Sequence, residues 1–238
     1  MKRKKIGVIG AMNSEVAHLF DAMTDRTAEP VADLTFYRGS IGGNDVIVVR
    51  CGVGKVNAAR CAQMLIDRYA PDYIINTGIA GGVGDGLRVG DLVVGTELVQ
   101  HDFDISSFGY AKGYISGIGN GKSASVFRSD AKLTKAFLRT VCTFLPENRV
   151  HTGRIATGDL FVSDAEAKKR LKNDFSALAV EMEGCAIAQT AWVNDVPFLV
   201  VRALSDLADG TAASSFETFE RETAELSARV IEAFIQAF

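Results

Sequence analysis

Short apolar runs alternate with segments of helical period along almost the whole chain of 238 residues. The first run covers residues 5–10, KIGVIG, and the segment after it places apolar side chains on one helix face, at Val16, Leu19, Phe20 and Met23. Buried strands that alternate with amphipathic helices are typical of α/β proteins. The alternation therefore predicts one α/β domain with a mostly parallel or mixed sheet between helices.

The same pattern predicts the positions of the other elements. Further strands are expected at residues 34–41, 45–51, 71–78, 91–99, 151–157, 177–181 and 198–205. Helices are expected from residue 13 or 14, within 51–69, over 130–144 and 164–172, from 183 and from 216. Gly42-Gly43-Asn44 separates two of the strands and predicts a hairpin. Residues 100–127 are polar and glycine-rich without a clear period, and long loops of this kind usually serve function or assembly.

Composition and charge exclude several classes of protein. No apolar stretch reaches the ~18 residues that a transmembrane helix needs, and the basic start MKRKKIGVIGAM is better explained by a first strand than by a targeting segment. A formal net charge of −3 without a basic stripe gives no reason to expect a nucleic-acid or membrane partner.

Cysteines and histidines give no metal-binding pattern. The four cysteines include no C-x-x-C pair, which indicates reduced thiols and a cytoplasmic location. His18, His101 and His151 are scattered and lack ligand spacing. The loop CGVGKVN at 51–57 matches neither a P-loop nor a dinucleotide fingerprint. We therefore expect neither a metal nor a cofactor.

Two carboxylates interrupt an apolar run at residues 177–189, ALAVEMEGCAIAQ. Burying an ionised carboxylate costs several kcal/mol unless it is paired or hydrogen-bonded, so Glu181 and Glu183 are not explained by stability alone. Each has a structural interpretation: Glu183 can complement a helix N-terminus, and Glu181 can pair with an arginine.

Conspicuous polar residues also follow other predicted strands. Glu15 comes after the first strand, the turn NTGIAGG follows another, and Asp206 ends the strand FLVVRALS. Glu15 alone could be an ordinary acidic residue of a first helical turn, and Asp206 alone could be a cap. Ligands of open α/β sheets bind beyond the carboxyl ends of the strands, so the set indicates a ligand site.

Seven motifs occur in order along the chain: IGAMNSEV, GVGKVNAA, NTGIAGG, HDFDISSFGY, TGDLFV, VEMEGCAIA and RALSDLADG. Together they resemble the 5′-methylthioadenosine/S-adenosylhomocysteine nucleosidases of the purine nucleoside phosphorylase superfamily. The resemblance implies a three-layer α/β/α fold with a central mixed sheet, a single catalytic domain over residues 1–238, and a homodimer. It also implies irreversible hydrolysis of adenine thionucleosides, with a role in methionine salvage.

The resemblance also implies roles for individual residues. Asp206 protonates N7 of adenine with Ser205 beside it, Glu15 activates the water, and Glu183 holds the ribose hydroxyls. Arg202 steadies this carboxylate group. The remaining substrate contacts are expected at Met12, Val53, Gly81, Phe161, Val162, Met182 and Phe216, with Ile105 and Phe108 contributed across the dimer interface. Glu181 faces away from the sugar and is expected to be structural and ion-paired.

This chain departs from the family at Ile79, where the motif NTGSAGG commonly has serine. The segment KGYISGIGNGKSASVF, residues 112–127, is also individual. Ile79 removes a hydrogen-bonding group beside the sugar and adds bulk there, which bears on efficiency and substrate preference.

Three alternative functions stay open at this point. A phosphorylase of the same fold is disfavoured because Glu15 would repel a phosphate dianion. Hydrolysis of aminodeoxyfutalosine cannot be distinguished from hydrolysis of the thionucleosides by the motifs at the adenine end of the site. A non-catalytic binder of adenine nucleosides does not need an acid, a base and a sugar clamp together.

Overall fold

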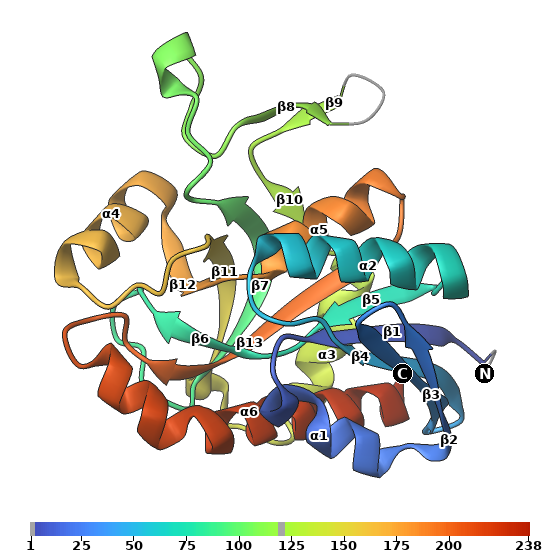
Figure 1. Ribbon diagram of the computed structural model, residues 1–238. Coiled ribbons are helices and arrows are strands. Elements are labelled where there is room, and N and C mark those ends of the chain that lie inside the picture. Colours follow the sequence, from blue (N-terminus) through green and yellow to red (C-terminus); the bar gives the residue numbers. More distant parts are fainter. Residues whose placement is uncertain (1–2, 119–121) are drawn as a thin grey trace.

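One mixed sheet of eleven strands runs through the protein (Figure 1), whose computed structural model describes residues 3–118 and 122–238. The strand order is β10-β7-β11-β12-β6-β13-β5-β1-β4-β3-β2. The strands are β1 (Lys5–Gly10), β2 (Thr24–Val31), β3 (Leu34–Ile41), β4 (Asn44–Arg50), β5 (Tyr73–Asn76), β6 (Ile79–Gly82), β7 (Leu92–Gln100), β10 (Phe127–Arg128), β11 (Val150–Thr157), β12 (Ala177–Glu181) and β13 (Phe198–Asp206). β8 (Ile115–Ile118) and β9 (Lys122–Ala124) form a separate antiparallel pair.

Part of this sheet closes on itself. β7, β11, β12, β6 and β13 are successive neighbours, and β13 also pairs antiparallel with β7. β13 therefore has a central place, since it also pairs in parallel with β5 and β6. The closure was not predicted from the sequence. Within it β6 lies between β12, to which it is antiparallel, and β13, to which it is parallel.

Helices cover both faces of the sheet, which confirms the predicted three layers. The helices are α1 (Asn13–Ala22), α2 (Lys55–Tyr69), α3 (Ala131–Val141), α4 (Ala165–Phe175), α5 (Gly184–Val193) and α6 (Ala212–Ala237), with 3₁₀ turns η1 (Ser106–Phe108) and η2 (Glu147–Arg149). α2 and α5 pack on one face, and α1, α3 and α6 on the other (Figure 1). Within the described residues, no helix combines the length and apolar character needed to cross a bilayer.

The central strands are apolar because both of their faces are buried. In β1, Ile9 packs into the core under α2 and α5, whereas Ile6 and Val8 pack into the core under α1, α3 and α6. β4 divides its side chains in the same way, with Val49 on the first side and Val48 on the second. Near-continuous apolar runs are the expected sequence of strands buried on both faces.

Most predicted elements are confirmed, and four expectations need correction. The expected turn NTGIAGG contains a strand, β6, which pairs with β12 and β13. The hairpin at Gly42-Gly43 is present as β3–β4, with Ile41 paired to Asn44. β2 was not predicted, because it is an edge strand with mostly exposed polar side chains. α6 begins at Ala212 rather than at 216. The described part of 100–127 contains η1 and three short strands, where no regular element was expected.

Candidate active site

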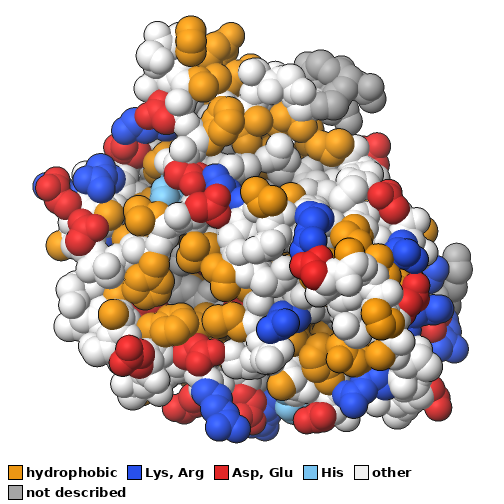
Figure 2. Space-filling view, in the orientation of Figure 1, with side chains coloured by type: hydrophobic (Ala, Val, Ile, Leu, Met, Phe, Trp, Pro, Cys, Tyr) orange, Lys and Arg blue, Asp and Glu red, His pale blue; other side chains and the backbone are white. Residues whose placement is uncertain are grey.

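A cavity of about 200 Å³ lies beside β6, where β12 and β13 end. Figure 2 shows a hollow on this side of the molecule with hydrophobic side chains gathered around it. The lining residues are Ala11, Met12, Glu15, Val53, Ile79, Ala80, Gly81, Phe161, Val180, Glu181, Met182, Glu183, Ser205, Asp206 and Phe216. The segments that follow β1 and β5 and the ends of β12 and β13 converge there, as expected, and bring together the acidic residues Glu15, Glu181, Glu183 and Asp206. Glu181 was expected to face away from the site, but it lines the cavity as well.

Glu15 is held in the first turn of α1 by the backbone. Its Oε2 accepts hydrogen bonds from the N–H groups of Ala11 (2.6 Å) and Met12 (3.0 Å), and its Oε1 accepts one from the N–H of Ile79 (3.1 Å). The side chain is 4% exposed. Burial raises the pKa of this carboxyl above 4.5, while the positive charge of Arg202 and the three N–H groups oppose the rise. The result is a fixed carboxylate whose basicity is increased.

Asp206 ends β13 and is 2% exposed. Its Oδ2 accepts a hydrogen bond from the Ser205 hydroxyl (2.9 Å), and its Oδ1 accepts one from the N–H of Ala208 (2.8 Å). Burial raises the pKa of the carboxyl above 3.8, and these two hydrogen bonds oppose the shift. A buried carboxyl of raised pKa is suited to carry a proton to a bound ligand.

Glu183 stands at the N-cap of α5 and is 6% exposed. Its Oε1 accepts a hydrogen bond from the N–H of Gly54 (2.7 Å), which immediately precedes α2. Burial raises the pKa of the carboxyl to about 8, and the charge of Glu181 adds to this rise. The prediction that Glu183 starts a helix is confirmed, and its carboxylate also lines the cavity.

Two glycines of the segment NTGIAGG make room for these acids. A Cβ atom at Gly78 would lie 2.5 Å from Glu15 Oε1, and a Cβ atom at Gly81 would lie 2.8 Å from Asp206 Oδ1. Real Cβ atoms essentially never come this close to another atom. The glycines are thus required by the close approach of the carboxylates to the backbone.

Glu181 and Arg202 form a buried ion pair between their Oε2 and Nη2 atoms. Glu181 also accepts hydrogen bonds from the N–H of Gly184 (2.6 Å) and from the Thr157 hydroxyl, and Arg202 donates to Asn76 Oδ1 (2.6 Å). This confirms that Glu181 is ion-paired. Arg202 is 1% exposed and lies behind the cavity, so it acts on the site through Glu181 and through its charge.

Ten of the predicted site residues line the cavity, and four do not. The side chain of Val162 faces a different cavity next to His101 and α4, although its main chain follows the lining residue Phe161. Ile105 and Phe108 lie in a segment that projects from the sheet at the top of Figure 1, and Phe108 is 79% exposed. Arg202 is the fourth predicted residue that does not line the cavity.

Sequence reasoning missed some lining residues. Ala11, Ala80 and Val180 were not singled out, although each lies within one of the quoted motifs. Their contribution is small apolar surface, which leaves no distinctive signal in one sequence.

Comparison with known proteins assigns this chain to a family. A family model described as the phosphorylase superfamily matches residues 5–236. The 5′-methylthioadenosine/S-adenosylhomocysteine nucleosidase of Shewanella loihica is 43% identical over 216 residues, which are 90% of this chain and 91% of that protein. The chain belongs to this nucleosidase family.

Solved structures agree with the assignment to the nucleosidase family. The Neisseria meningitidis nucleosidase, in complex with methylthio-immucillin-A, is 38% identical with a TM-score of 0.94, covering 99% of this chain and 100% of that one. A futalosine hydrolase of Helicobacter pylori is 30% identical with a TM-score of 0.92, covering 99% and 98%. The predicted family and three-layer fold are confirmed.

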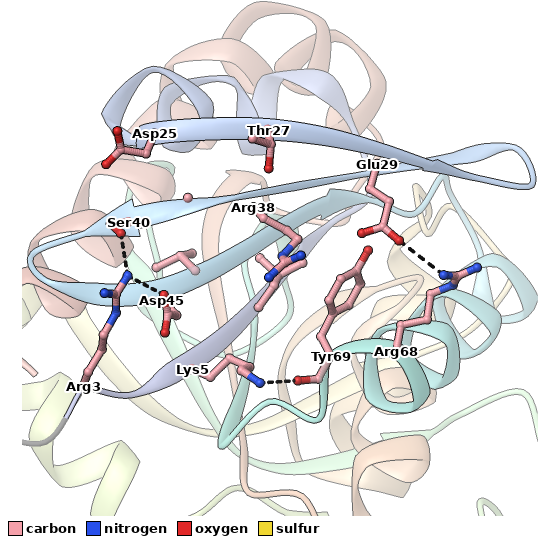
Figure 3. Close-up of a pocket in the computed structure, with 13 residues that line it drawn as sticks. Arg3, Lys5, Asp25, Thr27, Glu29, Arg38, Ser40, Asp45, Arg68 and Tyr69 are labelled. Atoms are coloured by element: carbon pink, nitrogen blue, oxygen red, sulfur yellow. Dashed lines mark hydrogen bonds and ion pairs between the residues drawn. The ribbon is translucent and has the colours of Figure 1, made fainter.

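A second cavity lies away from the residues that the nucleosidase motifs supply. It is formed by β1, β2, β3, β4 and the end of α2 (Figure 3). Its charged groups largely satisfy one another: Arg3 contacts Asp45 (2.5 Å), Arg68 contacts Glu29 (3.3 Å), and Lys5 donates to the carbonyl of Tyr69 (2.8 Å). None of the predicted site residues lines it.

Proposed function

We propose that the protein hydrolyses the N-glycosidic bond of 5′-methylthioadenosine and S-adenosylhomocysteine. The products are adenine and either 5-methylthioribose or S-ribosylhomocysteine. The convergence of Glu15, Glu183 and Asp206 on one aromatic-walled cavity carries the proposal. Membership of the nucleosidase family supports it.

The reaction breaks the bond between N9 of adenine and C1′ of ribose. The adenine anion is a poor leaving group, so N7 needs a proton, and the ribose becomes cation-like and needs negative charge nearby. A water molecule must also be directed at C1′. This chemistry requires an acid, a base and a grip on the sugar hydroxyls.

Each acidic residue has one of these roles. Asp206 delivers the proton to N7, because burial raises its pKa and Ser205 fixes its orientation. Glu15 activates the water, because three backbone N–H groups fix its carboxylate. Glu183 binds the ribose hydroxyls, and in its ionised form it places negative charge beside the developing cation.

Apolar residues hold the base and the sugar. Phe161 stacks on adenine. The ring of Phe216 lies edge-on to the ring of Phe161, with 5.7 Å between the two centroids. The main chain of Val162 binds the edge of the base, and Gly81 lets the backbone approach it. The remaining walls are Met12, Val53 and Met182.

The lining of the cavity favours water over phosphate as the nucleophile. Among its described lining residues there is no arginine, lysine or histidine. A phosphate dianion needs such cationic partners, and the Glu15 carboxylate would repel it. Hydrolysis is therefore the better interpretation.

A second candidate substrate is aminodeoxyfutalosine. The likeness to a futalosine hydrolase favours it as the alternative, since that protein shares the fold at 30% identity. The two candidates differ in the 5′ substituent and share the adenine and ribose groups.

The chain is further proposed to act as a cytoplasmic homodimer. In this dimer Phe108 and Ile105 cover the cavity of the partner subunit, which is supported by the exposure of Phe108 and by the absence of both residues from the described lining of their own cavity. Four free cysteines, of which three are buried, support a reducing compartment. Sedimentation of the wild type and of Phe108→Ser tests the dimer, and a monomeric wild type would contradict it.

Adenine release from the three nucleosides tests the function, in phosphate-free and phosphate-rich buffers. Asp206→Asn and Glu15→Gln are each expected to lower kcat/KM by about 10²–10⁴-fold, the usual contribution of a positioned acid or base. Asp33→Asn is the matched control, because Asp33 forms an exposed ion pair with Arg60 outside the cavity. Intact substrate after prolonged incubation, or formation of a ribose 1-phosphate, would refute the proposal. Faster turnover of aminodeoxyfutalosine would favour the second candidate.

A further inference from the structure

An ion pair outside the cavity joins the start of α2 to the end of β7. Lys55 Nζ lies 2.6 Å from Asp102 Oδ1 and donates to Gln100 Oε1 at 3.1 Å. The two charged side chains are 18% and 29% exposed, so this pair is more protected from solvent than a typical surface salt bridge. Neither residue lines the cavity.

Asp159 closes this contact into a ring that includes a third turn. Its Oδ1 accepts a hydrogen bond from the N–H of Lys55 (2.9 Å), and its own N–H donates to Asp102 Oδ2 (2.9 Å). Asp159 follows β11 and stands two residues before Phe161. The turns after β7 and β11 are thus fastened to the first residue of α2.

Gly54 connects this ring to the sugar clamp. Its N–H donates to Glu183 Oε1 (2.7 Å), and the next N–H along the chain, that of Lys55, donates to Asp159. Gly54 has a φ of 97°, in a region open to glycine, so its backbone has little intrinsic preference for this conformation. The anchored N–H groups on either side hold it.

Glu183 depends strongly on this one donor. Among the described residues, Gly54 alone donates a hydrogen bond to its carboxylate. The charged groups that face it are Glu181, Glu15 and Arg202, and Arg202 is already bound to Glu181. The position of the Glu183 carboxylate is therefore sensitive to the position of the Gly54 N–H.

We propose that Lys55 and Asp102 are positioning residues, which hold the Gly54 N–H against Glu183 and so keep the sugar clamp in place from outside the cavity. The inference rests on the proposed function, in which Glu183 binds ribose. It adds two charged residues that touch no substrate, and it makes the clamp depend on the turns after β7 and β11.

Steady-state kinetics of Lys55→Met test this, with Lys172→Met as the control. Lys172 forms a comparable 2.6 Å ion pair with Asp85 on the surface, so its loss should leave kcat/KM unchanged. Lys55→Met should lower kcat/KM about 10- to 100-fold, the range for losing a hydrogen bond to a charged group. Asp102→Asn should act in the same direction, the double variant should add little, and Lys55→Arg should recover part of the loss.

The pH profile separates positioning from a general loss of structure. The Gly54 hydrogen bond lowers the pKa of Glu183, so weakening it should move the acidic limb of kcat/KM to higher pH in Lys55→Met. The inference would be overturned if the wild type releases adenine and both Lys55→Met and Asp102→Asn have the same kinetics and the same pH profile as the wild type. A wild type that releases no adenine would instead refute the proposed function. If Lys55→Met does not fold, Asp102→Asn decides.

Discussion

Glu183→Gln should make the folded protein more stable at pH 8 while it abolishes the sugar clamp. Burial raises the pKa of Glu183 from 4.5 to about 8, and Glu181 adds to the shift. Between these two values the folded protein holds a proton that the unfolded chain releases. The stability contributed by this group is therefore complete below pH 4.5 and is lost as the pH rises through 8.

The pKa values fix the size of the effect. Each unit of pH inside this window changes the free energy of unfolding by about 1.4 kcal/mol. Between pH 5 and pH 8 the wild type should therefore lose on the order of 3 kcal/mol through this one carboxyl. At 6% exposure, solvent screening reduces the value little. Glutamine keeps an oxygen for the Gly54 N–H but carries no titrating proton, so the variant should lack this loss.

Urea unfolding at pH 5, 6, 7 and 8 measures the difference between the wild type and Glu183→Gln. Glu15 and Asp206 also have raised pKa values, but they are present in both proteins and largely cancel in the comparison. Glu147→Gln, at an exposed position, controls for the general effect of removing a carboxylate. Parallel pH dependences for wild type and Glu183→Gln would refute the reasoning.

Two further perturbations address the buried network and the departure from the family. Arg202→Met should destabilise the protein by about 3–5 kcal/mol in urea unfolding, because it leaves Glu181 buried without its cation, whereas Arg202→Met/Glu181→Leu should recover most of that loss. A double variant no more stable than Arg202→Met would contradict this. Ile79→Ser removes a buried apolar side chain from the cavity wall and should cost about 2–4 kcal/mol of stability. It should also lower KM for methylthioadenosine by adding a hydroxyl beside the ribose, and an unchanged KM would show that Ile79 does not face the sugar.

Strands buried on both faces were predictable, and the exposed edge was not. β1 and β13 have apolar sequences because helices cover both sides of them, so their runs identify them. β2 has the sequence TDRTAEPV and owes its conformation to pairing with β3. Nothing in its own residues distinguishes it from a loop.

The acids of the site were predictable because they follow recognisable strands. Their backbone partners were not, since Gly54, Ile79 and Ala208 bind through N–H groups that any residue except proline possesses. The closure of the sheet by the β7–β13 pairing could not be predicted either, because pairing between distant strands leaves no local pattern in the sequence.

Because Glu15 comes from α1 and Asp206 from the end of β13, the chemistry is assembled from the two extremes of the polypeptide. Liberation of the nucleobase requires both extremes to be in place, so it can serve as a measure of complete renaturation. An intermediate could recover much of its helical circular dichroism and still yield no adenine, so comparing the two signals over time would distinguish early collapse from final assembly.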